Sequence, residues 1–329
     1  MKALVYTNPF EVTYRDEPDA KAGHGESIIE VEAVGICGSD MHAFQGHDAR
    51  RNPPLILGHE VAGKVMAGEL QGERVILNPL ITCTYCDYCL TGRSNLCENR
   101  TMIGMTRPGG FADQVSIPDH CLVTIPYDME AHKAALTEPA ATSLHGLALV
   151  ARVAARPLCE ARALVIGGGS VGLLAALMLH DQGCEEIVLA ETNKQRGETA
   201  SATGVCEVVD PVNSDINENH FDVVVDAVGN GITRKLASST IKPGGVLLHI
   251  GLTDNAEGLD MRKMTLAEVI VIGTYTYTTA DLRATVKKLF SGALGSLDWV
   301  EQRSLASGAQ AFDDLLNHRC AAPKIVLHP

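Results

Sequence analysis

The order of apolar and polar residues divides the chain into two parts with different periodicities. In the first 140 residues, short runs alternate apolar and polar positions, as at residues 28–34, 61–66 and 74–77. Glycines such as Gly68 and Gly72 separate these runs. Strict alternation is typical of strands that bury one face. The pattern therefore predicts a mostly β region built of short strands and turns.

From residue 163 onward, short apolar runs alternate with helical stretches. The runs predict strands at residues 164–166, 187–189, 222–225, 246–250 and 269–272, with a helix over 171–181 after the first strand. Such alternation is the signature of βαβ units around a parallel sheet. The tail predicts helices over 281–290 and 309–317 and a last strand over 324–327. The fold class is therefore α/β.

Composition and charge restrict the function. A chain of 329 residues with 46% hydrophobic residues predicts about two globular domains. The net charge is −13 and there is no basic stripe, which argues against nucleic acid and anionic membrane surfaces as partners. The longest apolar stretch, residues 164–179, is interrupted by glycines and too short to span a membrane. The N-terminus lacks the apolar core of a secretion signal, so we expect a reducing, cytoplasmic location.

Four closely spaced cysteines are the strongest chemical signal. Cys83, Cys86 and Cys89 recur every three residues, and Cys97 follows within the same loop. Four thiolates can complete a tetrahedral shell around Zn²⁺ and leave no position for a substrate. Free cysteines or a pair of disulfides are the alternatives, but such tight spacing without a secretion signal favours a structural zinc.

A glycine-rich turn predicts a dinucleotide site. Gly167, Gly169 and Gly172 follow a predicted strand and open a helix, and Val171 lies within the turn. Glycines let the backbone approach a pyrophosphate at the positive end of the helix, and Glu191, at the end of the next strand, can accept from the ribose 2′-hydroxyl. This favours NAD over NADP. Arg196 either pairs with a 2′-phosphate or, as we expect, covers the adenine ribose.

A second metal site is suggested by residues in three separate segments. Cys37 lies in the segment Gly-Ile-Cys-Gly-Ser-Asp, His59 and Glu60 follow Gly58, and Glu138 precedes a proline. One thiolate, one imidazole and one or two carboxylates can hold Zn²⁺ with a position open to substrate. From the residues alone, a lone cysteine is usually a core residue and a lone histidine is usually an ordinary, satisfied polar residue.

Over its whole length the chain resembles the zinc-containing medium-chain alcohol dehydrogenases, in particular the sorbitol and polyol dehydrogenase branch. The resemblance rests on the order of Cys-Gly-Ser-Asp, Gly-His-Glu, the four-cysteine loop and the glycine-rich turn. It implies a GroES-like, zinc-binding catalytic domain over 1–140 and 278–329, and a Rossmann NAD-binding domain over 141–277. It also implies a homodimer or homotetramer, as does the apolar strand predicted at 269–272, which would be an exposed sheet edge.

The resemblance also implies roles for single residues. Cys37, His59 and Glu60 would bind a catalytic zinc, and Glu138 would bind it directly or through its water. Ser39 would take the substrate proton and His42 would pass it to solvent. Lys324 matches a basic residue that reaches the cofactor pyrophosphate. The implied reaction transfers hydride from a secondary alcohol to NAD and gives a ketone, with two zinc ions in each subunit.

The substrate and two other functions stay open. Sorbitol dehydrogenases carry an arginine where this chain has Thr276, which argues against sorbitol itself. An anionic substrate would need an arginine or lysine clamp, and the only candidates are Arg50, Arg51 and Arg107. We therefore expect a neutral polyol. A threonine, amino-alcohol or sugar-phosphate dehydrogenase is the alternative within the family. A non-catalytic cofactor-binding protein is the alternative of another class.

Overall fold

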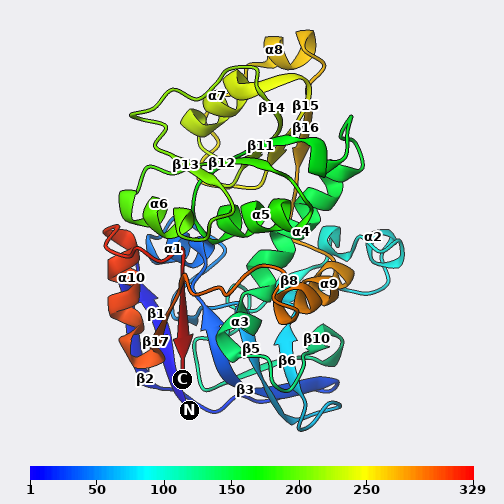
Figure 1. The fold of residues 1–329 in the computed structure, drawn as a ribbon. Helices are drawn as coiled ribbons and strands as arrows, with labels where there is room; N and C mark the ends of the chain where they lie inside the picture. The colour runs from blue at the N-terminus through cyan, green and yellow to red at the C-terminus, as the bar shows by residue number, and fades with distance from the viewer. The chain divides into compact units, whose positions relative to one another are not determined.

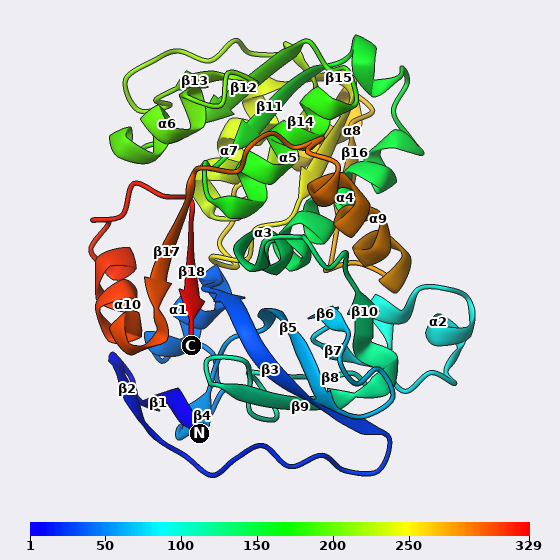
Figure 2. The same ribbon diagram turned by 60° about the horizontal axis from the view of Figure 1, so that its bottom comes forward.

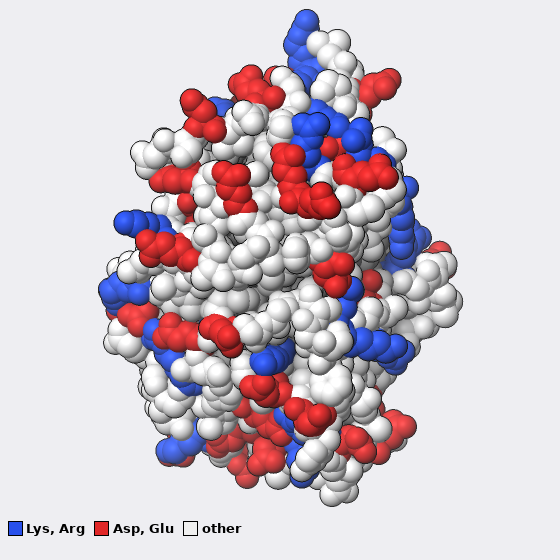
Figure 3. All heavy atoms as spheres, in the orientation of Figure 1, with Lys and Arg blue, Asp and Glu red and all other residues white.

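The computed structural model describes all 329 residues, which form two compact units (Figure 1). The first unit comprises residues 1–138, 278–291 and 300–329, and the second comprises residues 139–277 and 292–299. None of the helices has the length and apolar character needed to cross a membrane. Acidic and basic side chains are interspersed on the face shown in Figure 3.

The second unit is built on a six-stranded, wholly parallel sheet of order β13-β12-β11-β14-β15-β16. Its strands are β11 (Arg162–Ile166), β12 (Glu186–Ala190), β13 (Glu207–Val209), β14 (Phe221–Asp226), β15 (Ile241–His249) and β16 (Ile270–Gly273). Its helices are α5 (Ser170–Asp181), α6 (Lys194–Ser201), α7 (Gly231–Thr240), α8 (Met261–Leu266), the short η3 (Leu158–Glu160) and most of α4 (Thr137–Ala151). Helices α5 and α6 lie on one face of the sheet, and α7 and α8 on the other (Figure 1).

The helices on both faces of the sheet explain why the sequences of its central strands are unbroken apolar runs. Both faces of the sheet are covered by helices, so every residue of β14 is buried. The direction of strand addition reverses between β11 and β14, which is the point where sheets of this kind bind their ligands. The predicted doubly wound Rossmann fold is confirmed.

The first unit is mostly β, with β3 at its centre. A seven-stranded sheet has the order β10-β6-β5-β3-β18-β17, with β9 also paired to β3, and smaller sheets have the orders β2-β1-β4 and β7-β8. The first strands are β1 (Lys2–Asn8), β2 (Glu11–Asp16), β3 (Glu26–Gly35), β4 (Leu55–Ile56), β5 (Glu60–Ala67) and β6 (Arg74–Leu77). The others are β7 (Leu80–Ile81), β8 (Thr101–Met102), β9 (Gln114–Pro118), β10 (Leu122–Thr124), β17 (Val300–Ser304) and β18 (Lys324–His328).

Short helices complete the first unit. They are α1 (Gly38–Phe44), α2 (Asp87–Leu90), α3 (Ala131–Ala135), α9 (Thr279–Phe290), α10 (Gly308–Leu316), η1 (Ser94–Leu96), η2 (Asp119–Cys121) and η4 (Leu305–Ser307). The C-terminal strand β18 pairs with β17 and with the end of β3, where Val326 faces Gly35 (Figure 2). The last residues of the chain are therefore held beside the segment that carries Cys37.

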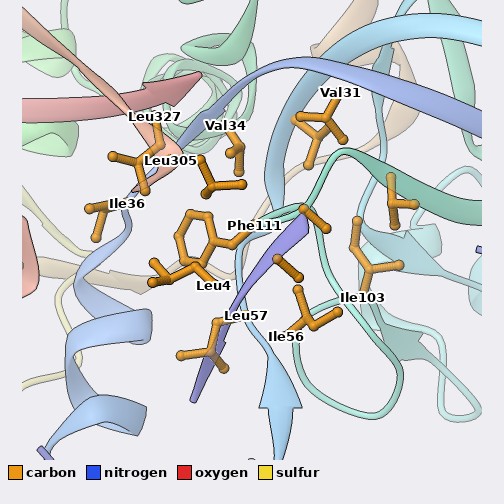
Figure 4. Packing of buried hydrophobic residues seen from close by; sticks show 14 of the residues in the cluster. Leu4, Val31, Val34, Ile36, Ile56, Leu57, Ile103, Phe111, Leu305 and Leu327 are labelled. Atoms are coloured by element: carbon orange, nitrogen blue, oxygen red, sulfur yellow. The ribbon is translucent and has the colours of Figure 1, made fainter. Parts of the chain in front are cut away.

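The core of the first unit lies between the sheets and α10. Leu4, Val34 and Phe111 are almost completely buried there, together with Leu327 from the C-terminal strand (Figure 4). Phe111 meets Phe312 of α10 edge to face, with 5.9 Å between ring centroids. Packing of this kind holds the loops around β3 and β5 in fixed positions, which a site built from those loops requires.

Candidate metal and cofactor sites

Cys37, His59 and Glu60 come together at the end of the β3–β5 pair. Each offers one ligand atom, and these atoms lie within 4.8 Å of one another. The strands are antiparallel and Gly35 is opposite Glu60, so the residues just beyond Gly35 and just before Glu60 become neighbours. A thiol, an imidazole and a carboxylate are donors that suit Zn²⁺, and three protein ligands leave a fourth position open.

Gly35 is required for this arrangement. A Cβ atom at Gly35 would lie 1.9 Å from Glu60 Oε2, so any side chain there would displace the carboxylate. Gly58, which precedes His59, has a φ of +89°, and a Cβ atom there would lie 2.6 Å from the Phe111 ring. Glycine at both positions therefore brings the backbone close enough to seat the two ligands.

Asp40 supports the histidine from α1. Its Oδ2 accepts from the backbone N–H of Cys37 at 3.0 Å, and its Oδ1 lies 3.5 Å from His59 Nδ1. The carboxylate is fully buried, and His59 Nδ1 is buried without a hydrogen-bond partner. Burial disfavours a charged imidazole, but Asp40 and Cys37 outweigh it and raise the pKa of His59 well above its ordinary value. A metal ion would have to displace that proton.

Lys324 has partners other than the predicted pyrophosphate. Its Nζ donates to both Glu60 oxygens, at 2.7 and 2.8 Å, and to the carbonyl oxygen of Ile36 at 2.8 Å. The lysine is 2% exposed and Glu60 is fully buried. An ammonium group has three N–H donors, and all three are used here. Lys324 therefore lies at the candidate metal site, and its expected contact with a cofactor pyrophosphate stays a prediction.

Glu138 is placed differently from the three ligand candidates. It lies in the first turn of α4 and contributes no ligand atom to the group of Cys37, His59 and Glu60. Burial opposes the charged form of Lys324, but Glu60, Cys37 and also Glu138 together raise the pKa of its ammonium group. Glu138 is thus part of the electrostatic surroundings of the site.

Ser39 and His42 lie on α1, immediately after Cys37. They are three residues apart and therefore share one face of the helix. Burial lowers the pKa of His42. The nearby His47 and Arg51 lower this pKa further, whereas Asp48 raises it. The imidazole is therefore neutral at pH 7 and can accept a proton.

The four-cysteine loop forms a second group of side chains that could hold a metal ion. The ligand atoms of Cys83, Cys86, Cys89 and Cys97 lie within 4.8 Å of one another, and all are free thiols. The Sγ atoms of Cys83 and Cys89 are 3.9 Å apart. Tetrahedral Zn–S geometry sets about 3.8 Å between sulfur atoms, so the loop fits zinc. Burial opposes ionisation of Cys83, but the backbone N–H groups of Tyr85 and Cys86 lower its pKa to about 6.

The glycine-rich turn joins β11 to α5. Gly167 has a φ of +101°, and a Cβ atom at Gly172 would lie 1.9 Å from the carbonyl oxygen of Gly167, so the turn requires glycine at both positions. Gly169 is the N-cap residue of α5, and Val171 lies in the first turn of that helix. The unpaired N–H groups of this helix end face the loop, as a pyrophosphate site needs.

Glu191 lies at the end of β12 beside the turn. Its Oε2 accepts from the backbone N–H of Gly168 at 2.8 Å and its Oε1 from that of Asn193 at 2.7 Å. Arg196 Nη1 is 3.7 Å from Glu191 Oε2, and Arg196 Nε is buried without a partner. A carboxylate and a guanidinium therefore both stand where a cofactor ribose would bind.

Two family models match parts of the chain. The family model for the alcohol dehydrogenase GroES-like domain matches residues 23–127, and that for the zinc-binding dehydrogenase domain matches residues 170–291. An uncharacterized zinc-type alcohol dehydrogenase-like protein of Haemophilus influenzae is 30% identical, with 84% of this chain and 83% of that protein covered. The chain belongs to the zinc-containing medium-chain alcohol dehydrogenase family.

Other members of the family differ in their substrates. L-galactonate-5-dehydrogenase of Escherichia coli K12 is 28% identical, over 97% of this chain and 96% of that protein. Acetophenone reductase of Geotrichum candidum, solved with NAD, has a TM-score of 0.88 and 26% identity over 100% of this chain and 97% of that one. A zinc-binding dehydrogenase of Sinorhizobium meliloti, solved with NADP, has a TM-score of 0.86 and 26% identity over 100% and 99%. The chain is thus a dehydrogenase whose substrate class the family does not fix.

The three arginines considered as clamps for an anionic substrate have different partners in this dehydrogenase. Arg107 pairs with Glu26 at 2.7 Å, away from the metal-binding residues, and Arg50 pairs with Asp48 at 2.8 Å on the surface. Arg51 instead lies against Ser39. No local sequence pattern predicts the contact between Arg51 and Ser39, because it joins a loop residue to a helix residue twelve positions earlier.

Proposed function

We propose that this chain is a zinc- and NAD-dependent dehydrogenase that oxidises a secondary alcohol group of a neutral polyol to a ketone. The observation that carries the proposal is the placement of Ser39 and His42 on the helix that begins at Cys37, beside the group formed with His59 and Glu60. Metal-ligand candidates and a proton acceptor on one short segment fit alcohol oxidation. A protein that only binds a cofactor needs neither.

The chain's own residues supply the other requirements. Cys37, His59 and Glu60 would hold the zinc, with Glu138 acting directly or through water. Bound zinc would act as a Lewis acid on the substrate hydroxyl. Ser39 Oγ would accept the proton that the hydroxyl loses, and His42, held neutral, would carry it toward solvent.

The second unit would bind NAD. The end of α5, reached through Gly167, Gly169 and Gly172, would receive the pyrophosphate, with Val171 beside it. Glu191 would accept from the ribose 2′-hydroxyl and repel a 2′-phosphate, while Arg196 would cover the adenine ribose. The four-cysteine loop would hold the second zinc as a structural ion.

The preference for a neutral substrate rests on the basic residues near the metal site. Arg51 and Lys324 are buried and hydrogen-bonded within the protein, and Arg50 is paired with Asp48. Each of the three already pairs with a carboxylate of the protein, Arg50 and Arg51 with the same Asp48, and this favours a neutral substrate over one that carries a carboxylate or phosphate. The E. coli relative acts on a sugar acid by its name, so a charged substrate is the competing possibility.

A substrate comparison decides between these possibilities. NADH formation would be followed at equal concentrations of a hexitol, its phosphate, an aldonic acid, threonine and a short secondary alcohol, with Cys37→Ser as the inactive control. We expect the highest kcat/KM for a neutral alcohol. A higher value for an aldonic acid, phosphate or threonine would overturn the neutral-substrate assignment alone. No NADH from any alcohol with zinc-loaded protein would overturn the proposed function.

We also propose a homodimer or homotetramer in a reducing, cytoplasmic setting. Strand β16 is the edge of the parallel sheet, and its Ile270 and Val271 are 39% and 41% exposed. An apolar edge of this kind is a template for pairing with another chain. Light scattering at micromolar concentration should give a multiple of the 35.0 kDa chain mass, and a monomer would contradict this proposal.

A further inference from the structure

Arg51 is a buried cation whose partners are all known. Its side chain is fully buried. Nε donates to the carbonyl oxygen of Gly104 at 2.9 Å, and Nη1 donates to Asp48 Oδ2 at 2.7 Å and to the carbonyl oxygen of Ser39 at 3.2 Å. Nη2 donates to Ser39 Oγ at 3.2 Å. Two arms of one guanidinium therefore hold both the main chain and the hydroxyl of Ser39.

The contact with Oγ restricts what the Ser39 hydroxyl can do. A guanidinium group has only donors, so Oγ must accept from it. The hydroxyl hydrogen must then point away from Arg51, and one lone pair remains on the oxygen. A hydroxyl that relays a proton needs this state, because it receives a proton on the lone pair and releases its own hydrogen on another side. Without Arg51 the hydroxyl could rotate among several acceptors.

The charge of Arg51 adds a second effect. It lies within hydrogen-bond distance of the oxygen on which negative charge would develop if the hydroxyl gave up its hydrogen first. Fixed donors aimed at developing charge in a water-poor setting are among the larger contributions to catalysis. Asp48 offsets part of this charge, but its carboxylate contacts Nη1, whereas Nη2 faces Ser39.

We propose that Arg51 is a positioning residue for proton transfer, which holds the Ser39 hydroxyl in the state that accepts the substrate proton and passes its own toward His42. The proposal rests on the proposed function, since it assigns Ser39 to the relay. The competing role is structural only: Arg51 would tie the loop of Asp48 and Gly104 to α1. The two roles differ in whether the effect of Arg51 depends on the Ser39 hydroxyl.

A double-mutant cycle separates the two roles. Arg51→Met, Ser39→Ala and the double variant would be compared for kcat, KM and the solvent deuterium isotope effect on kcat, with zinc content and Tm measured on each. Arg50→Met is the matched control, because Arg50 shares Asp48 as a partner but its side chain is 66% exposed. Arg51→Lys replaces Arg51→Met if the latter fails to fold, because lysine keeps the positive charge but cannot donate from two separate nitrogen atoms as the guanidinium group does.

We expect Arg51→Met to lower kcat at least about tenfold with little change in KM, and to raise the solvent isotope effect. In the Ser39→Ala background, Arg51→Met should lower kcat by less than about threefold, because the hydroxyl that Arg51 positions is gone. Arg50→Met should stay within about twofold of the parent.

Equal losses in both backgrounds, or an unchanged isotope effect, would overturn the inference and leave the proposed function standing. Absence of alcohol oxidation by the unaltered protein would overturn both.

Discussion

The ion pair between Lys324 and Glu60 gives the sharpest prediction about stability. Lys324→Met keeps the length of the side chain and removes its charge, so the fully buried Glu60 carboxylate loses the donor that contacts both of its oxygens. Removing one partner of a buried ion pair costs about 3–5 kcal/mol, because the other charge stays buried and unpaired. Replacing both partners by neutral groups costs much less. Lys324→Met with Glu60→Gln should therefore recover most of the loss.

Zinc must be controlled in this experiment, because a metal at the same site would give Glu60 another cation. The variants are best compared in a Cys37→Ser background, which impairs the reactive site and leaves the four-cysteine loop intact. Calorimetry should show the transition of the first unit lowered by about 10 °C in Lys324→Met, taking a few degrees per kcal/mol. The cost should be smaller when Cys37 is present and zinc is bound.

Two results would refute this reasoning. One is a decrease in the free energy of unfolding of less than about 1 kcal/mol for Lys324→Met in the Cys37→Ser background, which is the value expected of an exposed ion pair. The other is a double variant with Glu60→Gln that is as unstable as the single one. Either would mean that the carboxylate is hydrated or reoriented and does not depend on Lys324.

Three further predictions concern the metal and cofactor sites. Cys97→Ser should lose about one zinc per chain and unfold at a lower temperature, because a structural zinc contributes folding free energy; an unchanged Tm and zinc content would refute the assignment. Zinc uptake at the site of Cys37, His59 and Glu60 should weaken as pH falls, because the raised pKa of His59 means that a proton competes with the metal. Chelator competition should show the zinc affinity falling by more than about tenfold between about pH 8 and pH 6. A zinc affinity that does not change with pH would contradict this prediction. Glu191→Ala should narrow the preference for NAD over NADP in kcat/KM, whereas an unaltered ratio would place the discrimination elsewhere, for example at Arg196.

The parallel-sheet unit could be predicted from the sequence because its signals are local. Unbroken apolar runs predicted the strands now seen as β11, β12, β14 and β15, since strands covered on both faces need no polar alternation, and the same kind of run predicted the partly exposed edge strand β16. The short β13 was missed, as its three residues are too few to show a period. Helix α1 was also missed, because it is only seven residues long and Ser39, Asp40 and His42 leave it no clear apolar period.

The metal site was only partly predictable, for a different reason. Cys37 and His59 were proposed from their motifs, but their proximity depends on the pairing of Gly35 with Glu60 across β3 and β5. The partners of Lys324 and Arg51 lie up to 288 residues away in the chain, and no spacing rule reveals them. The pairing of the C-terminal strand with β3 places Lys324 at Glu60, and the sequence motifs gave no sign of this contact.

We propose above all that Cys37, His59 and Glu60 form a reactive zinc site separate from the four-cysteine loop. The most direct test is the zinc content of Cys37→Ser measured together with its NADH formation from the best alcohol. We expect about two zinc ions per chain in the parent protein, about one in Cys37→Ser, and no NADH formation by the variant. A Cys37→Ser protein that keeps both zinc ions, or that oxidises the alcohol at the parent rate, would contradict it.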